Sequence, residues 1–315
     1  AAPPATAPPP RRADALVSAL FSPERFSPGR VADACAPDVV WEDLSGAKAV
    51  LRGREEVLSA LSARPRPASG SGVDFAEYVV DRVAEGAEST GFTWHREVDG
   101  SWGLRGTTFV ELDAEGRIKY VREIAEPLLK PGASTEALLR ALSKPDEEWT
   151  RRAEERRASF KPRAKLPSRA DEMVKYLWLD VQGAEIDEVL KNFGEDVVYE
   201  DFNFPEPFRG KDQVSAFLNA FNIPGITFVP EKFSEGETRA CFTWHVEIAG
   251  VPGQRIRGVS FYETGADGRV SYVRDIPESA VKPPPVLALA SALRPGLRRF
   301  SPASPLYPRG GVSPT

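Results

Sequence analysis

The chain contains two histidines, and each ends the same four-residue run. Residues 92–95 and 242–245 both read Phe-Thr-Trp-His, which places the histidines at His95 and His245. An imidazole near its reference pKa of about 6.5 can act as a general acid or base. The alternative is a histidine that makes one fixed hydrogen bond where two sheets meet. Because a repeated contact of that kind needs two histidines, we favour the structural role.

A second repeated pattern ends in a carboxylate. Residues 38–43 read Asp-Val-Val-Trp-Glu-Asp and return at 196–201 as Asp-Val-Val-Tyr-Glu-Asp. A buried carboxyl with a raised pKa can transfer a proton, but an aspartate at a strand end more often serves a turn or a cap, and we expect the latter. In an enzyme, the proton carriers and ligand contacts would be His245, Asp201 and Tyr199 in the second copy, with His95, Asp43 and Trp41 at the matching positions of the first.

A third repeat joins a tyrosine to an arginine. Tyr120 and Arg122 share one side of a predicted strand, and the second copy repeats them. They could bind a carboxylate or carbonyl ligand, or the arginine could pair across strands with a repeated acid such as Asp43 or Asp201. We favour the ion pair. The candidates for a ligand pocket are the aromatic and cationic residues of the repeats: Trp94, Trp244, Tyr120, Tyr272, Arg122 and Arg274.

Composition excludes several classes of protein and selects none. The 315 residues suffice for two domains, and 41% hydrophobic with 28% charged residues is typical of a globular chain. Two cysteines cannot build a disulfide scaffold or a structural zinc site. No phosphate-loop, GxGxxG, HExxH or CxxC pattern occurs, so we expect no metal and no cofactor. A net charge of −5 does not indicate nucleic-acid binding.

Basic residues gather in the connecting and terminal segments. The Pro- and Ala-rich start of the chain predicts a disordered tether. The chain begins with Ala1 and its one methionine is Met173, from which we expect that a targeting peptide has been removed. Basic runs are usually solvated, but they can also contact an acidic protein or an anionic membrane surface. The candidates for partner binding are Arg151, Arg152, Arg156, Arg157, Arg294, Arg298 and Arg299.

Together the repeats indicate an internal duplication. Each copy shows helical periodicity first and then strands separated by glycine turns. This order predicts an α+β fold, with helices packed on one face of a curved antiparallel sheet. The predicted organisation is a disordered N-terminus (1–12), a first domain (13–131), a charged and partly helical linker (132–169), a second domain (170–285) and a basic Pro-rich tail (286–315).

The order of elements and the repeated strands that begin Asp-Val-Val and Gly-Arg-Ile or Gly-Arg-Val resemble the nuclear transport factor 2-like (SnoaL-like) superfamily. Residues 243–247, 257–262 and 272–277 also resemble segments of its plant and algal plastid members. The resemblance implies two cone-shaped domains, each with a pocket between sheet and helices. It further implies that the open sheet faces pair, here as an intramolecular pseudo-dimer, and that the protein resides in a plastid.

Our first hypothesis for function is a non-catalytic binding or assembly module of a plastid, which contacts protein or membrane partners through linker and tail. It predicts one pocket collapsed by aromatic side chains and a large contact between the sheets. The alternative is a SnoaL-like enzyme of isomerase, cyclase or dehydratase type, acting by proton transfer on a small hydrophobic carbonyl compound. A second alternative is a carotenoid or lipid carrier. An open cavity with polar side chains would favour the enzyme.

Overall fold

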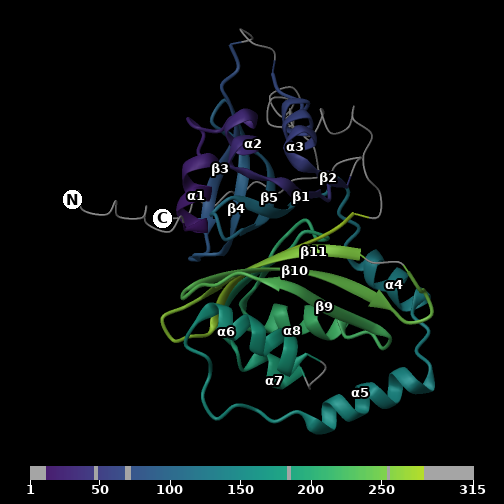
Figure 1. Cartoon of the computed structure of the whole chain (residues 1–315). Coiled ribbons are helices and arrows are strands. Elements are labelled where there is room, and N and C mark those ends of the chain that lie inside the picture. Colours follow the sequence, from purple (N-terminus) through teal and green to yellow (C-terminus); the bar gives the residue numbers. More distant parts are fainter. Residues whose placement is uncertain (1–11, 46–48, 68–71, 183–185, 254–255, 280–315) are drawn as a thin grey trace.

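The computed structural model describes residues 12–45, 49–67, 72–182, 186–253 and 256–279 (Figure 1). Except for Arg12, the predicted N-terminal tether lies outside these ranges, and so does the predicted tail with Arg294, Arg298 and Arg299. Within the ranges, the chain builds two α+β domains joined by a helical connector. The predicted fold class is thereby confirmed.

The first domain opens with helices and continues with a six-stranded sheet of order β2-β1-β6-β5-β4-β3. Its elements are α1 (Ala13–Leu20), α2 (Pro28–Ala34), β1 (Cys35–Asp43), β2 (Val50–Arg52), α3 (Gly53–Ser62), β3 (Phe75–Val83), β4 (Ser89–Val98), β5 (Ser101–Leu112) and β6 (Ile118–Ala125).

The second domain repeats this order in a sheet arranged β8-β7-β12-β11-β10-β9. Its elements are α6 (Ala170–Lys175), the π-helical segment η1 (Tyr176–Val181), α7 (Ile186–Leu190), β7 (Phe193–Asp201), β8 (Phe208–Arg209), α8 (Gly210–Phe221), β9 (Ile226–Phe233), β10 (Arg239–Ile248), β11 (Ile256–Thr264) and β12 (Val270–Pro277). In α8 the apolar residues Val214, Phe217, Leu218 and Phe221 recur at helical spacing and face the sheet.

Each sheet is mixed rather than wholly antiparallel. The four strands from β3 to β6 form an antiparallel meander, but β1 pairs with β6 in parallel, and β7 pairs with β12 in the same way. The prediction of a wholly antiparallel sheet was therefore wrong in this respect, because it did not include the parallel pair. Helix α3 or α8 and the meander lie between the two paired strands in sequence, which gives the long connection that a parallel pair needs.

A glycine in each domain lets a tryptophan lie against the sheet. Gly106 and Gly258 stand opposite Trp94 and Trp244 on neighbouring strands. A Cβ atom on either glycine would meet the indole Cζ2 at 2.2 Å. The indole nitrogens donate to Thr108 in the first domain and to Ser260 in the second, at 2.9 and 2.7 Å. The repeated Trp–Gly pair therefore shapes the interior of both domains.

The two sheets face each other across an apolar contact. In Figure 1 the second sheet lies between the first domain and the helices α6, α7 and α8. Buried side chains from both domains form one cluster there: Leu44, Ala84, Phe109, Ile124, Phe202, Cys241, Val259, Phe261, Tyr272 and Ile276. Burial of this many apolar side chains holds the domains together through the hydrophobic effect.

Ion pairs surround this contact, and they come in related sets. Arg105 Nη1 lies 2.8 Å from Glu200 Oε1, and Arg257 Nη1 lies 3.4 Å from Glu42 Oε1. Arginines of β6 and β12 also cross between the domains, since Arg122 lies 2.5 Å from Glu231 and Arg274 lies 3.9 Å from Asp81. The interface is therefore approximately two-fold symmetric in its polar contacts as well as in its strands.

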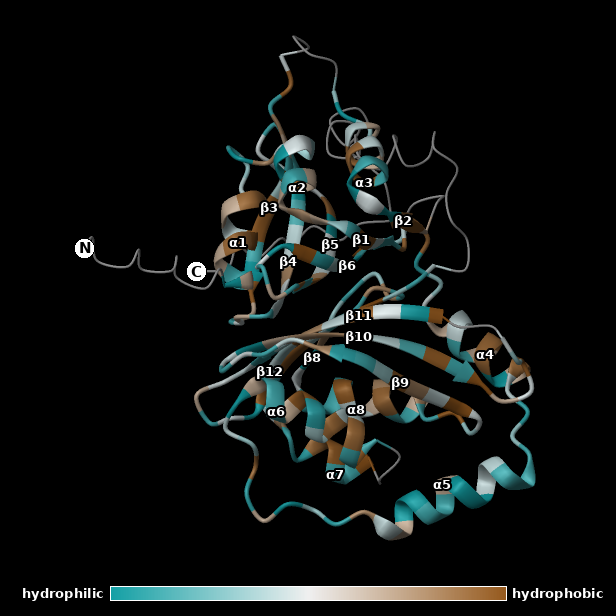
Figure 2. Ribbon diagram, viewed as in Figure 1, coloured by the Kyte–Doolittle hydropathy of each residue, from teal (hydrophilic) through white to brown (hydrophobic). Residues whose placement is uncertain are grey.

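The connector contains two helices, α4 (Ala133–Leu142) and α5 (Glu147–Ser159). Asp146 caps α5 by accepting a hydrogen bond from the backbone N–H of Trp149 at 2.7 Å. No residue of α5 is buried, and Figure 2 shows it as almost wholly hydrophilic. It lies beyond α7 and α8, at the end of the molecule opposite the first domain (Figure 1).

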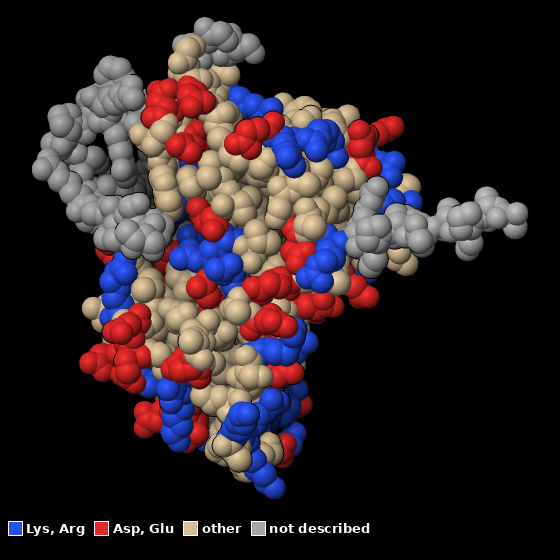
Figure 3. Space-filling model, turned by 90° about the vertical axis from the view of Figure 1, so that its left-hand side faces the viewer, with Lys and Arg blue, Asp and Glu red and all other residues tan. Residues whose placement is uncertain are grey.

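Acidic and basic side chains are interspersed over the face of the molecule in Figure 3. This mixture agrees with the small net charge of −5. Among the helices described, none combines the length and the apolar composition that crossing a membrane requires.

Candidate active site

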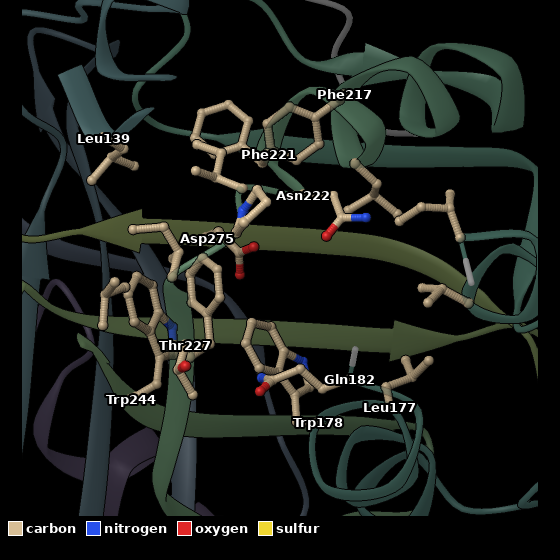
Figure 4. Close-up of a pocket in the computed structure, with 18 of the residues that line it drawn as sticks. Leu139, Leu177, Trp178, Gln182, Phe217, Phe221, Asn222, Thr227, Trp244 and Asp275 are labelled. Atoms are coloured by element: carbon tan, nitrogen blue, oxygen red, sulfur yellow. The ribbon is translucent and has the colours of Figure 1, made fainter. Parts of the chain in front are cut away.

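The second domain contains a cavity of about 580 Å³ between its sheet and its helices. Its wall is mostly apolar and aromatic, with Trp178, Phe217, Phe221 and Trp244 among the lining side chains. Figure 4 shows the carboxyl group of Asp275 in the middle of these rings. A cavity of this size and lining suits an apolar small molecule.

Two carboxyl groups reach this cavity from neighbouring strands. Asp201 ends β7, and Asp275 stands beside it in the parallel register of β12. Both side chains are buried, and the phenol of Tyr199 donates a hydrogen bond to Asp275 Oδ2. Asp275 Oδ1 is buried without a hydrogen-bond partner in the described structure. A buried polar oxygen beside an apolar cavity is a natural contact for a ligand.

Burial changes the acidity of this carboxyl pair. It raises the pKa of Asp201 to about 7, and the neighbouring charge of Asp275 adds to the effect. Burial likewise raises the pKa of Asp275 to about 6, against the opposing influence of the Ser260 and Tyr199 hydroxyls. The values belong to the pair, which therefore holds about one proton near pH 6.5, between the two values. Such a pair can both accept and donate a proton.

Two phenols beside the acids remain protonated. Burial raises the pKa of Tyr199 and of Tyr262 well above the ordinary range. Trp178, which comes from the π-helical segment η1, donates from Nε1 to the Tyr262 hydroxyl at 3.2 Å. Phenols held in this way are hydrogen-bond donors at physiological pH and can stabilise negative charge on an oxygen.

The first domain has the same strands but a filled interior. Its matching acids are Asp43 and Glu123, and Arg64 forms ion pairs with both, at 3.0 Å from Asp43. Tyr78 fills the space above Trp94, with ring centroids 4.9 Å apart, and donates to Glu123 at 2.6 Å. These contacts satisfy the acids and leave them no role toward a ligand.

One position accounts for much of this difference. Counted from the glycine that opens each helix, Gly53 or Gly210, Arg64 and Phe221 hold the same place. In the described part of the second domain, no arginine or lysine forms an ion pair with Asp201 or Asp275, and Phe221 lines the cavity. The exchange of arginine for phenylalanine removes the counter-charge and leaves the acids facing an apolar space.

Comparison with known proteins gives a family match within the domain that holds the cavity. Residues 178–273 match the SnoaL-like domain family. Among solved structures, the chain is similar to a "putative ketosteroid isomerase" from Kribbella flavida, at 24% identity over 37% of this chain and 82% of that chain, with a TM-score of 0.30. It is also similar to a "Putative SnoaL-like polyketide cyclase" from Jannaschia sp. CCS1, at 20% identity over 41% and 96% of the two chains, with a TM-score of 0.30. No curated protein matches.

The second domain places His245 away from its cavity. Strand alternation turns Trp244 toward the cavity and His245 toward the first domain, where Nδ1 lies 2.9 Å from Glu231 Oε1. His95 lies 2.7 Å from Asp81 in the same way. The candidate set of His245, Asp201 and Tyr199 therefore does not converge, because only the last two line the cavity.

The repeated Tyr–Arg pairs lie at the domain interface and not in the cavity. Arg122 pairs with Glu42 at 2.5 Å, and Arg274 pairs with Glu200 at 2.9 Å. The expected partners Asp43 and Asp201 lie one residue further along their strands, on the opposite face. Tyr120 and Tyr272 donate to the same two glutamates. Of the predicted pocket residues, Trp244 lines the cavity, while Trp94, like Trp41, is buried in the core of the first domain.

The partner-binding candidates in the connector divide into two groups. Arg151 pairs with Glu155 at 2.7 Å and Arg152 with Glu148 at 3.2 Å, both within α5. Arg156 and Arg157 instead lie on the wall of the cavity. The described residues hold no cluster of three or more His, Cys, Asp or Glu side chains that could bind a metal ion.

Sequence reasoning missed Asp275 as a cavity acid. The repeat containing Arg274 drew attention to the interface face of β12, whereas Asp275 lies on the other face with Val273. The parallel pairing of β7 with β12 is the signal that would have placed it beside Asp201, since that pairing brings the two strand ends together.

Proposed function

We propose that the second domain is a proton-transfer enzyme of isomerase, cyclase or dehydratase type acting on an apolar carbonyl compound, and that the first domain is its non-catalytic scaffold. The observation that supports this most is the pair Asp201 and Asp275, which is buried in an open apolar cavity and forms no ion pair within 4 Å in the described structure; the more distant charge of Lys130 lowers the pKa of Asp201 less than burial raises it. The filled interior of the first domain supports its structural role.

In the proposed mechanism the ionised Asp275 removes a proton from the carbon next to the carbonyl group. The protonated Asp201 donates a hydrogen bond to the carbonyl oxygen as it becomes an enolate oxygen, while the Tyr199 phenol keeps its hydrogen bond to Asp275 and holds that carboxyl in place. The proton held by the Asp275 carboxyl then returns to another carbon of the same ligand, which restores the starting state. The apolar wall keeps water away and so maintains the raised pKa values.

Hydrogen–deuterium exchange at carbon tests this function. We would incubate the protein in D₂O with neutral bicyclic and tricyclic ketones and enones, and follow exchange and double-bond migration by NMR. Asp275→Asn and Asp201→Asn should each lower the rate by about 10²–10⁴-fold, the usual contribution of a positioned acid or base. The matched first-domain variant Asp43→Asn should leave the rate within twofold. Equal rates in wild type and the double variant would contradict the proposal.

The cavity also supports a second candidate, a carrier of a carotenoid or another lipid. An apolar lining is sufficient to bind such a molecule without any reaction. The absorbance spectrum of protein purified from its native source would reveal a bound pigment. For a carrier, replacement of Asp201 or Asp275 would change affinity, and no exchange would occur at carbon.

Contact with protein or membrane partners through linker and tail, and residence in a plastid, remain proposals that rest on the sequence. A tagged copy in the source cells, compared with a copy lacking residues 286–315, would test both by fractionation. Unchanged association of the truncated protein with membranes or complexes would contradict a role for the tail.

A further inference from the structure

Helix α5 contributes to the cavity although it belongs to neither domain. Trp149, Thr150, Ala153, Arg156 and Arg157 from one side of the helix line the cavity, together with Glu154. The indole of Trp149 lies 3.4 Å from the hydroxyl of Thr227 on β9, which ties the helix to the sheet. Among the residues described, no helix precedes α1 as α5 precedes α6. Within the described structure, the connector therefore supplies a wall to the second domain that has no counterpart in the first.

The ends of α5 are fixed to the second domain more firmly than its middle. Before the helix, the backbone N–H of Lys144 donates to Ala249 at 2.9 Å. After it, Arg163 pairs with Asp180 at 2.8 Å and its guanidinium lies 4.6 Å from the Tyr176 ring centroid. Between these anchors no residue of α5 is buried. The side chains that α5 turns inward are consequently accessible to a ligand in the cavity.

The charges on α5 are unequally satisfied. Arg151 and Arg152 have glutamate partners within the helix, whereas Arg156 forms no ion pair in the described structure. Arg156 lies on the cavity wall. Asp201 and Asp275 line the same cavity from the sheet, and they together hold about one proton near pH 6.5, which limits repulsion of an anion. Basic charge on α5 and an acid pair on the sheet define a polarised site.

We infer that the ligand of this cavity is an amphiphilic acid: an apolar carbonyl compound that carries a carboxylate or another anionic group at the end remote from the carbonyl. Trp149 and the aromatic lining contact its apolar body, and Arg156 binds its anionic group, because a guanidinium matches the geometry of a carboxylate. This inference rests on the proposed function for the position of the carbonyl group, and it adds the class of substrate.

Two dyes of similar shape test the anionic subsite without knowledge of the natural ligand. The probes are 1-anilinonaphthalene-8-sulfonate, which is anionic, and N-phenyl-1-naphthylamine, which is neutral, titrated by fluorescence at low salt. Arg156→Gln should weaken the anionic dye about fivefold and leave the neutral dye within twofold. The matched control Arg152→Gln removes the same charge from the same helix, and both dyes should bind to it as to the wild type.

Further measurements show where the dyes bind. Phe221→Arg places a long cation inside the cavity and should abolish binding of both dyes; if this variant does not fold, Leu218→Arg, at another position that lines the cavity, answers the same question. Equal weakening of both dyes by Arg156→Gln, no weakening of either, or binding outside the cavity would overturn the inference. Hydrogen–deuterium exchange at the ligand's carbon atoms, and its loss in Asp275→Asn, are measured in a separate experiment. The proposed function can therefore be upheld even if the dye titrations contradict the anionic subsite.

Discussion

In the first domain Arg64 reaches the acids at the ends of β1 and β6, whereas in the second domain the matching helix ends in Phe221. The same strands, the same Trp–Gly pair and the same interface arginines surround both interiors. One interior is closed by an arginine and a tyrosine, and the other holds two acids in a cavity. The comparison teaches that the repeated residues build the scaffold, while the residues that differ between the copies decide the chemistry.

The largest effect is expected from removing the arginine that closes the first domain. Arg64→Leu would leave Glu77, Glu123 and Asp43 without this partner in a buried cluster. Loss of one partner from a buried pair typically costs about 3–5 kcal/mol, so the free energy of unfolding in urea should fall by about that amount. Arg66→Leu is the control, because Arg66 lies 3.8 Å from Glu77 with 35% of its side chain exposed, and a loss below about 1 kcal/mol is expected.

A third variant shows whether charge or packing causes that loss. Adding Glu123→Gln to Arg64→Leu removes the unpaired buried carboxylate and should restore part of the stability. If the two single arginine variants lose equal stability, the view that Arg64 closes this interior is contradicted.

The acids of the second domain should show the opposite behaviour, because their burial opposes folding when they are charged. Folding raises the pKa of Asp201 from 3.8 to about 7. Its contribution to stability is therefore fully present below about pH 4 and is lost as the pH rises to about 7. The Asp201→Asn variant has no carboxyl group to titrate at this position. The difference in free energy of unfolding, variant minus wild type, should therefore rise from near zero at pH 4 to as much as about 4 kcal/mol at pH 8.

Urea unfolding at several pH values measures this difference, and Asp43→Asn is its control in the first domain. Asp43 pairs with Arg64 in the folded state, so its replacement should reduce stability at pH 8. A lower stability of Asp201→Asn at pH 8 would show that the carboxylate is satisfied in the native state, and the two interiors would then be alike.

The sequence predicted what the two domains share more completely than what separates them. Alternating apolar residues and helical spacing placed the strands and helices, because those patterns reflect burial against one core. The acids of the cavity were harder to find, because Asp275 acquires its role only when β12 pairs in parallel with β7. The repeated histidines and arginines drew attention to the interface, since duplication marks shared packing. Arg64 and Phe221 stand at matching positions of the two copies, but only the structure shows that Arg64 reaches the acids while Phe221 lines the cavity.

A moderate and equal effect is expected at the shared glycines. Gly106→Ala and Gly258→Ala each place a methyl group 2.2 Å from a tryptophan carbon, which the indole must move to accommodate. Overpacking of this kind costs about 1–3 kcal/mol. Melting temperatures of the two variants should fall by similar amounts, with Gly194→Ala as the control, because a Cβ on this strand glycine would meet its nearest atom at an ordinary 3.5 Å. A large loss at one glycine alone would show that the Trp–Gly pair serves only one domain.

The smallest expected effect lies at the interface between the domains. It tests whether the two equivalent arginine–glutamate pairs contribute equally to stability. Arg105 lies 2.8 Å from Glu200 and its guanidinium stands 4.4 Å from the Phe202 ring centroid, while the equivalent Arg257 lies 3.4 Å from Glu42. Arg105→Ala should therefore cost about 1–2 kcal/mol of unfolding free energy and Arg257→Ala less than about 1 kcal/mol.

Both arginines also have a partner in their own domain, Glu126 for Arg105 and Glu278 for Arg257. Double-mutant cycles with Glu200→Ala and Glu42→Ala separate the cross-domain pairs from these local ones. A coupling energy larger for Arg257 with Glu42 than for Arg105 with Glu200 would contradict the order that the distances give.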